Sequence, residues 1–407
     1  MNECTEGHAT RTLNSDPSGP SLHDVIASLK WNAVALGLNG GLVLGCLFGQ
    51  KDSVLELSSR KDISPSRDLC LCEDRLFCID QHDDCYILEL SDATGARPKK
   101  VSVYNEVRTA GQDSLHSQSH RIADKEGIAA VGQVTLGAGS STLPAVPRSE
   151  HGLPQTSDKK TGVRHLACGD SMVLCALDPD RRAGRIVRSK EDEFVVHHFS
   201  QPLSVRAISC GKEHGLLLVD QGLVYSVGLG SRGQLGHGDT DSEREPRLIE
   251  ALGCVGVTSV SAGGWHSACI SDIGDLYVWG WNEAGQLGLS PEAEAEEEPG
   301  ASPPRSDHSP SRVTFQMVPA ILDLPGGVNV SKVSCGSRHT AAVTYDKRLY
   351  TWGWGKYGQL GHGDMESQDQ PKHVEFFHNE RLWVTDIMCG DWTTVAQTCP
   401  ALQPMPP

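Results

Sequence analysis

The chain has 407 residues, of which 38% are hydrophobic and 43 are glycine, and its net charge is −16. This composition is sufficient for one large array of repeats, and the glycine content exceeds the usual level of about 7%. Because duplex nucleic acid is normally bound by clustered Lys and Arg, the acidic balance argues against direct nucleic-acid binding. The 14 cysteines favour a reducing compartment with buried thiols over a disulfide framework.

The N-terminal half of the chain has few distinct motifs. Residues 1–22 show little apolar alternation and are predicted to form an irregular segment. Residues 23–200 are predicted to hold degenerate repeat units at 24–58, at 66–105 and within 127–200, with a polar irregular stretch at 106–164. Residues 33–48 are apolar for almost the thickness of a bilayer, but Asn39, Gly40 and Gly41 in their middle predict a hairpin turn. We therefore expect no membrane span.

Residues 201–400 repeat two strings of sequence three times. The first string is ISCGKEH, VSAGGWH or VSCGSRH, and it ends at His214, His266 and His339. The second string is YSVGLGSRGQLGHG at 225–238, YVWGWNEAGQLG at 277–288 and YTWGWGKYGQLGHG at 350–363. One glycine of each string recurs at a constant spacing, in the pairs Gly211 and Gly228, Gly263 and Gly280, and Gly336 and Gly353, and Gly390 marks a weaker fourth copy. A fixed offset in triplicate indicates a tandem array of one structural unit.

The unit itself is predicted to be a β-sheet. Its period of about 50 residues and its content of Val, Trp, Tyr and Gly match a β-propeller blade better than a helical repeat. Alternating apolar runs at 341–345 and 349–354 flank Asp346 and Lys347, which are predicted to form a hairpin turn. The predicted fold class is therefore all-β.

An acidic insertion separates the second and third copies of the strings. Residues 291–312, PEAEAEEEPGASPPRSDHSPSR, are rich in Glu, Pro and Ser and poor in apolar residues, which predicts a disordered surface loop. Ser302 and Ser309 each precede a proline and are candidate sites of proline-directed phosphorylation. The alternative is a tolerated insertion with no role. Residues 401–407 are assigned to a short tail.

The strings CGxxH and WGWGxxGQLGHG, with a polar tail that contains Pro (EREPRLIE, DQPKHVE), are similar to the regulator of chromosome condensation (RCC1) repeat family. The resemblance implies a ring of seven blades, with further blades at 205–250, 257–322, 330–375 and from Val384 onward. Because few residues follow Val384, the last blade needs strands from the N-terminus to close the ring. Either closure is imperfect, or the chain is a variant that lacks its first strand pair.

No catalytic or metal-binding arrangement stands apart from the repeats. His214, His266 and His339 occupy one repeat position, so we predict structural histidines that bond the backbone within each blade. Cys70, Cys72, Cys78 and Cys85 do not have the spacing of a zinc site. The chain is therefore predicted to be a non-enzyme with no metal and no cofactor.

The residue just before the motif histidine varies between repeats. Its occupants are Trp31, Glu213, Trp265, Arg338 and Trp392. Equivalent loops of a ring emerge on one face, and Trp and Arg dominate interface hot spots, so these five residues are predicted to form a partner-binding face. The alternative is that each Trp covers only its own blade. Trp279 and Trp352 are predicted to lie in the core, and Trp281 and Trp354 to be partly exposed.

The functional prediction is a non-catalytic interaction module that acts as a regulatory or docking subunit for another protein. The resemblance implies a chromatin-linked setting in the nucleus and cytoplasm. It also implies a JmjC-type histone oxygenase as partner, an indirect contact with histones, and a monomeric propeller. The alternative is a guanine-nucleotide exchange factor for a Ran-like small GTPase, as in the founding member of the family.

Overall fold

The computed structural model describes residues 162–401 apart from 179–180, 189–193 and 290–313, and, before residue 162, the strands given below together with Asp84 and Val101. The chain divides into two units, Met1–Tyr104 with Thr161–Pro407, and Asn105–Lys160. The second unit lies outside the described residues, so the first is described by itself. Trp31, Ser302, Ser309 and the insertion at 291–312 also lie outside the described residues.

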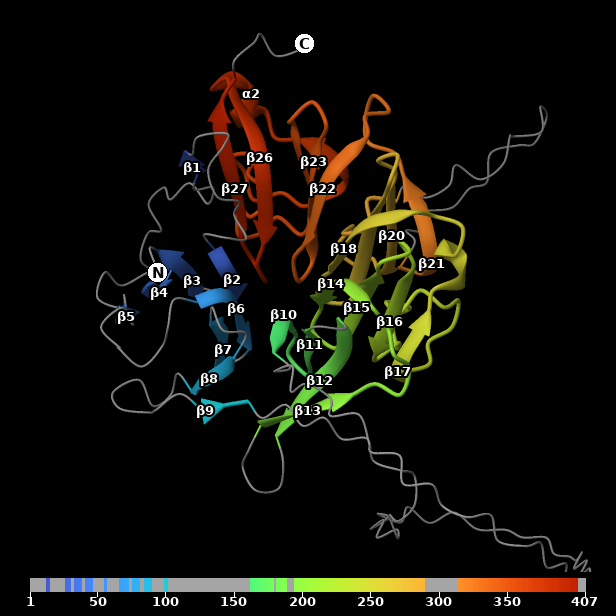
Figure 1. Ribbon diagram of the computed structural model, residues 1–407. Coiled ribbons are helices and arrows are strands. Elements are labelled where there is room, and N and C mark those ends of the chain that lie inside the picture. The colour runs from blue at the N-terminus through green and yellow to red at the C-terminus, as the bar shows by residue number, and fades with distance from the viewer. Residues whose placement is uncertain are drawn as a thin grey trace, which may run out of the picture. The chain divides into compact units, whose positions relative to one another are not determined.

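The described strands form seven sheets, each built from consecutive antiparallel strands with one exception (Figure 1). We number the sheets as blades in chain order. Blade 1 contains β2 (Ile26–Lys30), β3 (Ala33–Leu38), β4 (Gly41–Cys46) and β5 (Leu55–Glu56). Blade 2 contains β6 (Ser66–Cys72), β7 (Arg75–Asp80), β8 (Cys85–Glu89) and β9 (Lys99–Lys100). Blade 3 contains β10 (Val163–Cys168), β11 (Val173–Leu177), β12 (Arg182–Arg188) and β13 (Phe194–His198).

The motif-bearing repeats form the next three blades. Blade 4 contains β14 (Val205–Cys210), β15 (His214–Val219), β16 (Val224–Gly228) and β17 (Glu243–Leu248). Blade 5 contains β18 (Val257–Ala262), β19 (His266–Ser271), β20 (Leu276–Trp281) and β21 (Phe315–Leu322). Blade 6 contains β22 (Val330–Cys335), β23 (His339–Thr344), β24 (Leu349–Gly353) and β25 (Gln368–His373). Two short helices, η3 (Glu250–Leu252) and α2 (Glu375–Asn379), follow blades 4 and 6.

Blade 7 is the exception, because it combines the two ends of the chain. It contains β26 (Leu382–Cys389) and β27 (Thr394–Pro400), and β1 (Thr12–Asn14) adds to β27 in parallel, with Thr12 opposite Ala396. The expectation that residues 1–22 are irregular is therefore wrong for Thr12–Asn14. The last blade was expected to take strands from the N-terminus, and the pairing of β1 with β27 agrees with this expectation.

Successive blades contact one another through their first strands, in the order β2, β6, β10, β14, β18, β22 and β26. This succession of six adjacent four-stranded meanders and a three-stranded last sheet is the arrangement of a β-propeller, so the predicted all-β propeller class is confirmed. None of the helices in the described part of the chain is long and apolar enough to cross a membrane.

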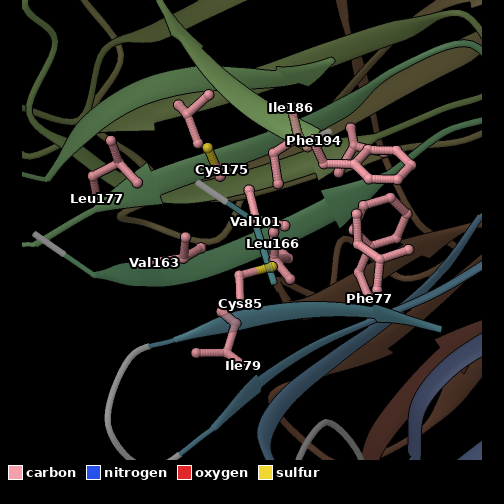
Figure 2. Packing of buried hydrophobic residues seen from close by; sticks show 13 residues of the cluster. Phe77, Ile79, Cys85, Val101, Val163, Leu166, Cys175, Leu177, Ile186 and Phe194 are labelled. Atoms are coloured by element: carbon pink, nitrogen blue, oxygen red, sulfur yellow. The ribbon is translucent and has the colours of Figure 1, made fainter. Parts of the chain in front are cut away.

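The hydrophobic core lies between blades. Figure 2 shows Phe77 and Ile79 of blade 2 packed with Leu166, Ile186 and Phe194 of blade 3, and the rings of Phe77 and Phe194 meet edge to face with centroids 6.4 Å apart. Further clusters join blades 3 and 4, 4 and 5, 5 and 6, and 6 and 7. Because each blade buries its faces only against its neighbours, the repeats stabilise one another.

The cysteines follow the sequence prediction with one correction. Among the described cysteines, eight are free thiols and most of these are buried. Burial raises the pKa of the Cys175 thiol to about 12, as expected of a thiol packed among apolar side chains. Cys168, in contrast, is disulfide-bonded and so departs from the expected buried thiols.

Candidate protein-interaction face

The first motif glycine is required by the motif histidine that follows it. At Gly336, an added Cβ would overlap the imidazole of His339 and lie 2.7 Å from the carbonyl oxygen of Gly390 in the next blade. Gly211 and Gly263 have the same two neighbours, the ring of their own histidine and a backbone oxygen of the next blade. The CGxxH string therefore encodes close packing of one blade against the next.

The second motif glycine is required by the backbone. Gly228, Gly280 and Gly353 have φ angles of 115°, 99° and 100°, a region that side chains rarely adopt. A Cβ at Gly353 would also approach the Cα of His339 to 2.7 Å. These glycines let the end of the third strand of each blade pass close to the loop that carries the varied residue.

The three motif histidines bridge neighbouring blades. Their Nε2 atoms lie 2.8–3.0 Å from hydroxyl oxygens of the following blade, in the pairs His214 with Ser267, His266 with Thr340, and His339 with Thr394. The predicted bond to backbone within the same blade is therefore wrong, although the structural role agrees with the prediction. The reason is that each imidazole points across the seam between blades.

The hydroxyl that contacts His214 shows which nitrogen of this imidazole carries the hydrogen. Ser267 Oγ donates to the carbonyl oxygen of Gln234 at 2.9 Å, so it must accept the hydrogen carried by Nε2 of His214. Burial lowers the pKa of His214 and of His266 to about 3 and that of His339 to about 4. The imidazoles are therefore neutral at physiological pH, and they link blades without carrying charge.

Four of the five predicted partner-binding residues lie in the described part of the chain, and all four are half-buried. Trp265 Nε1 donates a hydrogen bond of 2.8 Å to Oε2 of Glu213 in the preceding blade. Arg338 and Trp392 both lie against Trp354. Trp31 lies outside the described residues.

Arginine and tryptophan side chains alternate across blades 4 to 6. The guanidinium of Arg232 lies 4.4 Å from the ring centroid of Trp265 and 4.5 Å from that of Trp281. The guanidinium of Arg338 lies 4.8 Å from the ring of Trp281 and 5.0 Å from that of Trp354. Each arginine thus makes two cation–π contacts, and every one of these distances is within the range that gives appreciable attraction.

Aromatic contacts extend this row to blade 7. Trp392 meets Trp354 and Tyr357 edge to face, with ring centroids 5.9 Å and 5.5 Å apart. We name the continuous row the Trp–Arg ladder, and its members are Glu213, Arg232, Trp265, Trp281, Arg338, Trp354, Tyr357 and Trp392. The alternative that each Trp covers only its own blade does not fit Trp265 or Trp392, because each of them contacts residues of the preceding blade.

Half of the residues of the Trp–Arg ladder could be predicted from the sequence as partner-binding residues. Trp279 and Trp352 are fully buried, as predicted, and Trp281 and Trp354 are half-buried, also as predicted. Arg232 was missed, because its repeat position is Ala284 in blade 5 and Tyr357 in blade 6. The variation at this position could have identified Arg232, since the position lies beside the otherwise constant GQLG string.

These features define the class of protein: a β-propeller built from repeats of about 50 residues, whose last blade includes a strand from the N-terminal segment. The model of the regulator of chromosome condensation (RCC1) repeat matches residues 221–270, 274–343 and 346–397. A second RCC1 repeat model matches residues 205–234, 257–286 and 330–359. Residues 205–397 are therefore built from RCC1 repeats.

Curated relatives match about half of the chain. RCC1 domain-containing protein 1 of Homo sapiens is 48% identical over 209 residues, which cover 47% of this chain and 56% of that protein. The protein of the same name in Mus musculus is 48% identical over 216 residues, which cover 48% of this chain and 57% of that protein. The match thus spans little more than half the length of these relatives.

A solved structure shows the same fold. Prp20p from Saccharomyces cerevisiae superimposes with a TM-score of 0.60 at 16% sequence identity, over 91% of this chain and 81% of that protein. At this low identity the likeness is evidence for the fold alone.

Proposed function

We propose that this RCC1-repeat propeller is a non-catalytic interaction module that docks a protein partner through the Trp–Arg ladder. The observation that carries the proposal is the pair of arginines, Arg232 and Arg338, each held between two half-buried tryptophans. Trp and Arg are the residue types that contribute most to interface hot spots. Their mutual contacts hold both guanidinium groups in place before a partner arrives, which reduces the entropy lost on binding.

The finer part of the proposal concerns the partner. The family resemblance supports a chromatin-linked protein of the JmjC-type histone oxygenase class, in the nucleus or the cytoplasm, with any histone contact made through that partner. Nothing in the described residues favours nucleotide exchange on a Ran-like small GTPase, so exchange is kept only as an outcome of the test.

The test compares binding of purified JmjC-type histone oxygenases to the wild-type chain, Arg338→Ala and Trp392→Ala. We expect saturable binding that each substitution weakens by about 10- to 100-fold, the loss typical of a hot-spot residue. Lys372→Ala is the matched control, because Lys372 is exposed on the outer strand β25 of blade 6, away from the ladder. Thermal melting and circular dichroism establish that all variants are folded.

Two results would contradict the proposal. If the oxygenases bind the wild type and both ladder variants equally well, the interface lies elsewhere on the propeller. If the wild type instead accelerates the release of labelled GDP from a Ran-like GTPase, the exchange-factor alternative replaces the docking proposal.

A further inference from the structure

The outer strand of blade 5, β21, differs in chemistry from the corresponding strands of the two neighbouring blades. Each of the three strands contains one proline, Pro246, Pro319 or Pro371, which aligns them. Strand β17 reads EREPRL and is charged at four of its six positions, and β25 reads QDQPKH. Strand β21 reads FQMVPAIL and has no charged residue. Exposed edge strands usually carry charges that prevent unwanted association with other chains. Strand β21 lacks this protection.

The apolar side chains of β21 are exposed. The exposed fractions are 45% for Phe315, 36% for Met317, 40% for Val318 and 54% for Ile321. The positions of Met317 and Val318 are filled by Arg244 and Glu245 in blade 4 and by Asp369 and Gln370 in blade 6. The fold therefore accepts charged and polar side chains at these positions, and the apolar pair is specific to blade 5.

This strand is continuous with the Trp–Arg ladder. Phe315 pairs with Trp281 in the register of β20 and β21. The loop that carries Arg232 also touches β21, because a Cβ at Gly233 would lie 3.0 Å from the Cα of Met317. The backbone N–H of Gly238, in the same loop, donates to the Met317 carbonyl oxygen at 3.0 Å. Arg232 and the exposed part of β21 thus belong to one surface, which we name the Arg232–β21 surface.

Arg232 differs from the other cations of this face. Arg338 has Glu283 at 3.8 Å, Lys212 has Asp170 at 3.6 Å, and Lys356 has Glu366 at 3.7 Å. Among the residues that the structure describes, no carboxylate forms an ion pair with Arg232, whose guanidinium is held between the Trp265 and Trp281 rings. A guanidinium has five N–H donors at its edge. Those donors match the two oxygens of a carboxylate.

Addition of a partner strand to β21 is disfavoured by the backbone. The Met317 carbonyl oxygen already accepts from Gly238, and Pro319 has no N–H to donate. Binding on this surface therefore has to use side chains more than a backbone ladder.

We infer that the Arg232–β21 surface docks a short segment of the partner in which an Asp or Glu stands beside apolar side chains. The carboxylate pairs with the edge of the Arg232 guanidinium, and the apolar side chains cover Phe315, Met317 and Val318. This inference rests on the proposed docking function, and it names the chemistry of the partner at one end of the ladder.

The experiment selects peptides from a random library displayed on phage against the immobilised full-length chain. The peptides most enriched are synthesised with a fluorescent label, and their affinities are measured by fluorescence anisotropy. The first variant is the double substitution Met317→Arg with Val318→Glu, which copies the residues of blade 4 and so suits the fold. The second is Arg232→Ala. Arg244→Met is the matched control, because it makes the reverse exchange at the corresponding exposed position of blade 4.

We expect the selected peptides to contain Asp or Glu beside Leu, Ile, Phe or Met. Both variants should weaken binding by about tenfold or more, and Arg244→Met should leave it unchanged. A peptide whose acidic residue is changed to the amide should bind the wild type as weakly as the original peptide binds Arg232→Ala. The amide peptide should bind Arg232→Ala with the same affinity as it binds the wild type. Such non-additive losses would show that the peptide carboxylate and the Arg232 guanidinium contact each other.

Three results would overturn the inference. Selected peptides without an acidic residue, or with equal affinity for the wild type and both variants, would exclude the Arg232–β21 surface. If such peptides nevertheless lose affinity for Trp392→Ala, the proposed docking function stands without this inference. If they bind Trp392→Ala as tightly as the wild type, both the docking function and this inference are contradicted. If peptides bind only after the glutamates at 292, 294 and 296–298 are replaced by glutamine, the acidic insertion of the chain itself occupies the surface.

Discussion

His266 and Thr340 lie in neighbouring blades, and Nε2 of His266 donates a hydrogen bond of 2.9 Å to Oγ1 of Thr340. The Thr340 hydroxyl then donates to the carbonyl oxygen of Gln286 at 2.8 Å, and the same oxygen accepts from Nε1 of Trp352 at 2.9 Å. One blade earlier, His214, Ser267, Gln234 and Trp279 form an identical chain. The seams between these blades are thus joined by buried polar groups as well as by apolar contacts.

Removing the central hydroxyl should be costly. Thr340→Val retains the shape of the side chain but leaves Nε2–H of His266 without an acceptor at a buried site. We expect the free energy of unfolding to fall by about 1–3 kcal/mol, the cost of an unsatisfied buried group, as measured by urea denaturation. Thr240→Val, at an exposed loop position, is the control and should cost less than about 0.5 kcal/mol. Equal losses of stability in the two variants would show that the buried hydroxyl between the blades contributes no more than an exposed hydroxyl.

The buried histidines should make the propeller sensitive to acid. Their folded-state pKa values are lowered to about 3 for His214 and His266 and to about 4 for His339, whereas an unfolded histidine has a pKa of about 6.5. Above that value both states are neutral and stability is independent of these groups. Below it the unfolded state binds protons that the folded state does not, so stability falls with falling pH.

The expected loss is of the order of 1 kcal/mol per histidine per pH unit, between about pH 6.5 and pH 4. Urea midpoints measured across this range provide the test, with His266→Gln as the comparison, because that variant should show a shallower pH dependence. If His266→Gln and the wild type lose stability in parallel, His266 is not responsible.

Steric and conformational demands on glycine should be separable. Gly336→Ala places a methyl group against the His339 ring and the Gly390 carbonyl oxygen, and overpacking of this kind costs about 3 kcal/mol or more. Gly327 has a φ of 63° and open space around its Cα, so Gly327→Ala should cost only the conformational penalty of about 1–2 kcal/mol. Thermal melting of both variants tests the difference. Similar losses would argue against the steric explanation.

The cation–π contacts should be measurable as an interaction energy. In a double-mutant cycle of Trp281→Ala and Arg338→Ala, we expect a coupling of about 0.5–1 kcal/mol in the free energy of unfolding, the range for partly exposed pairs. The matched pair for comparison is Trp281 with Arg247, an exposed arginine that pairs with Asp239 and Glu243 instead. A coupling no larger than that of the comparison pair would mean that the ladder contacts do not stabilise the fold.

The repeat unit could be predicted from the sequence because its signals are local. Tight turns need glycine where φ is positive, so Gly228, Gly280 and Gly353 recur at a fixed distance from Gly211, Gly263 and Gly336. The strands of the first two blades also fall within the predicted ranges 24–58 and 66–105. A hairpin that is formed by neighbouring residues leaves its pattern in those residues.

The tertiary structure decided what depends on contacts between blades. The partners of the motif histidines, the parallel closing strand Thr12–Asn14, and the place of Arg232 between Trp265 and Trp281 all join segments distant in the chain. The same is true of the junction between Arg232 and β21. The sequence by itself determined the blade, because hydrogen bonds and turns within a blade are local. The surface was decided only when neighbouring blades packed together, because side chains from different repeats meet there at distances that no sequence period encodes.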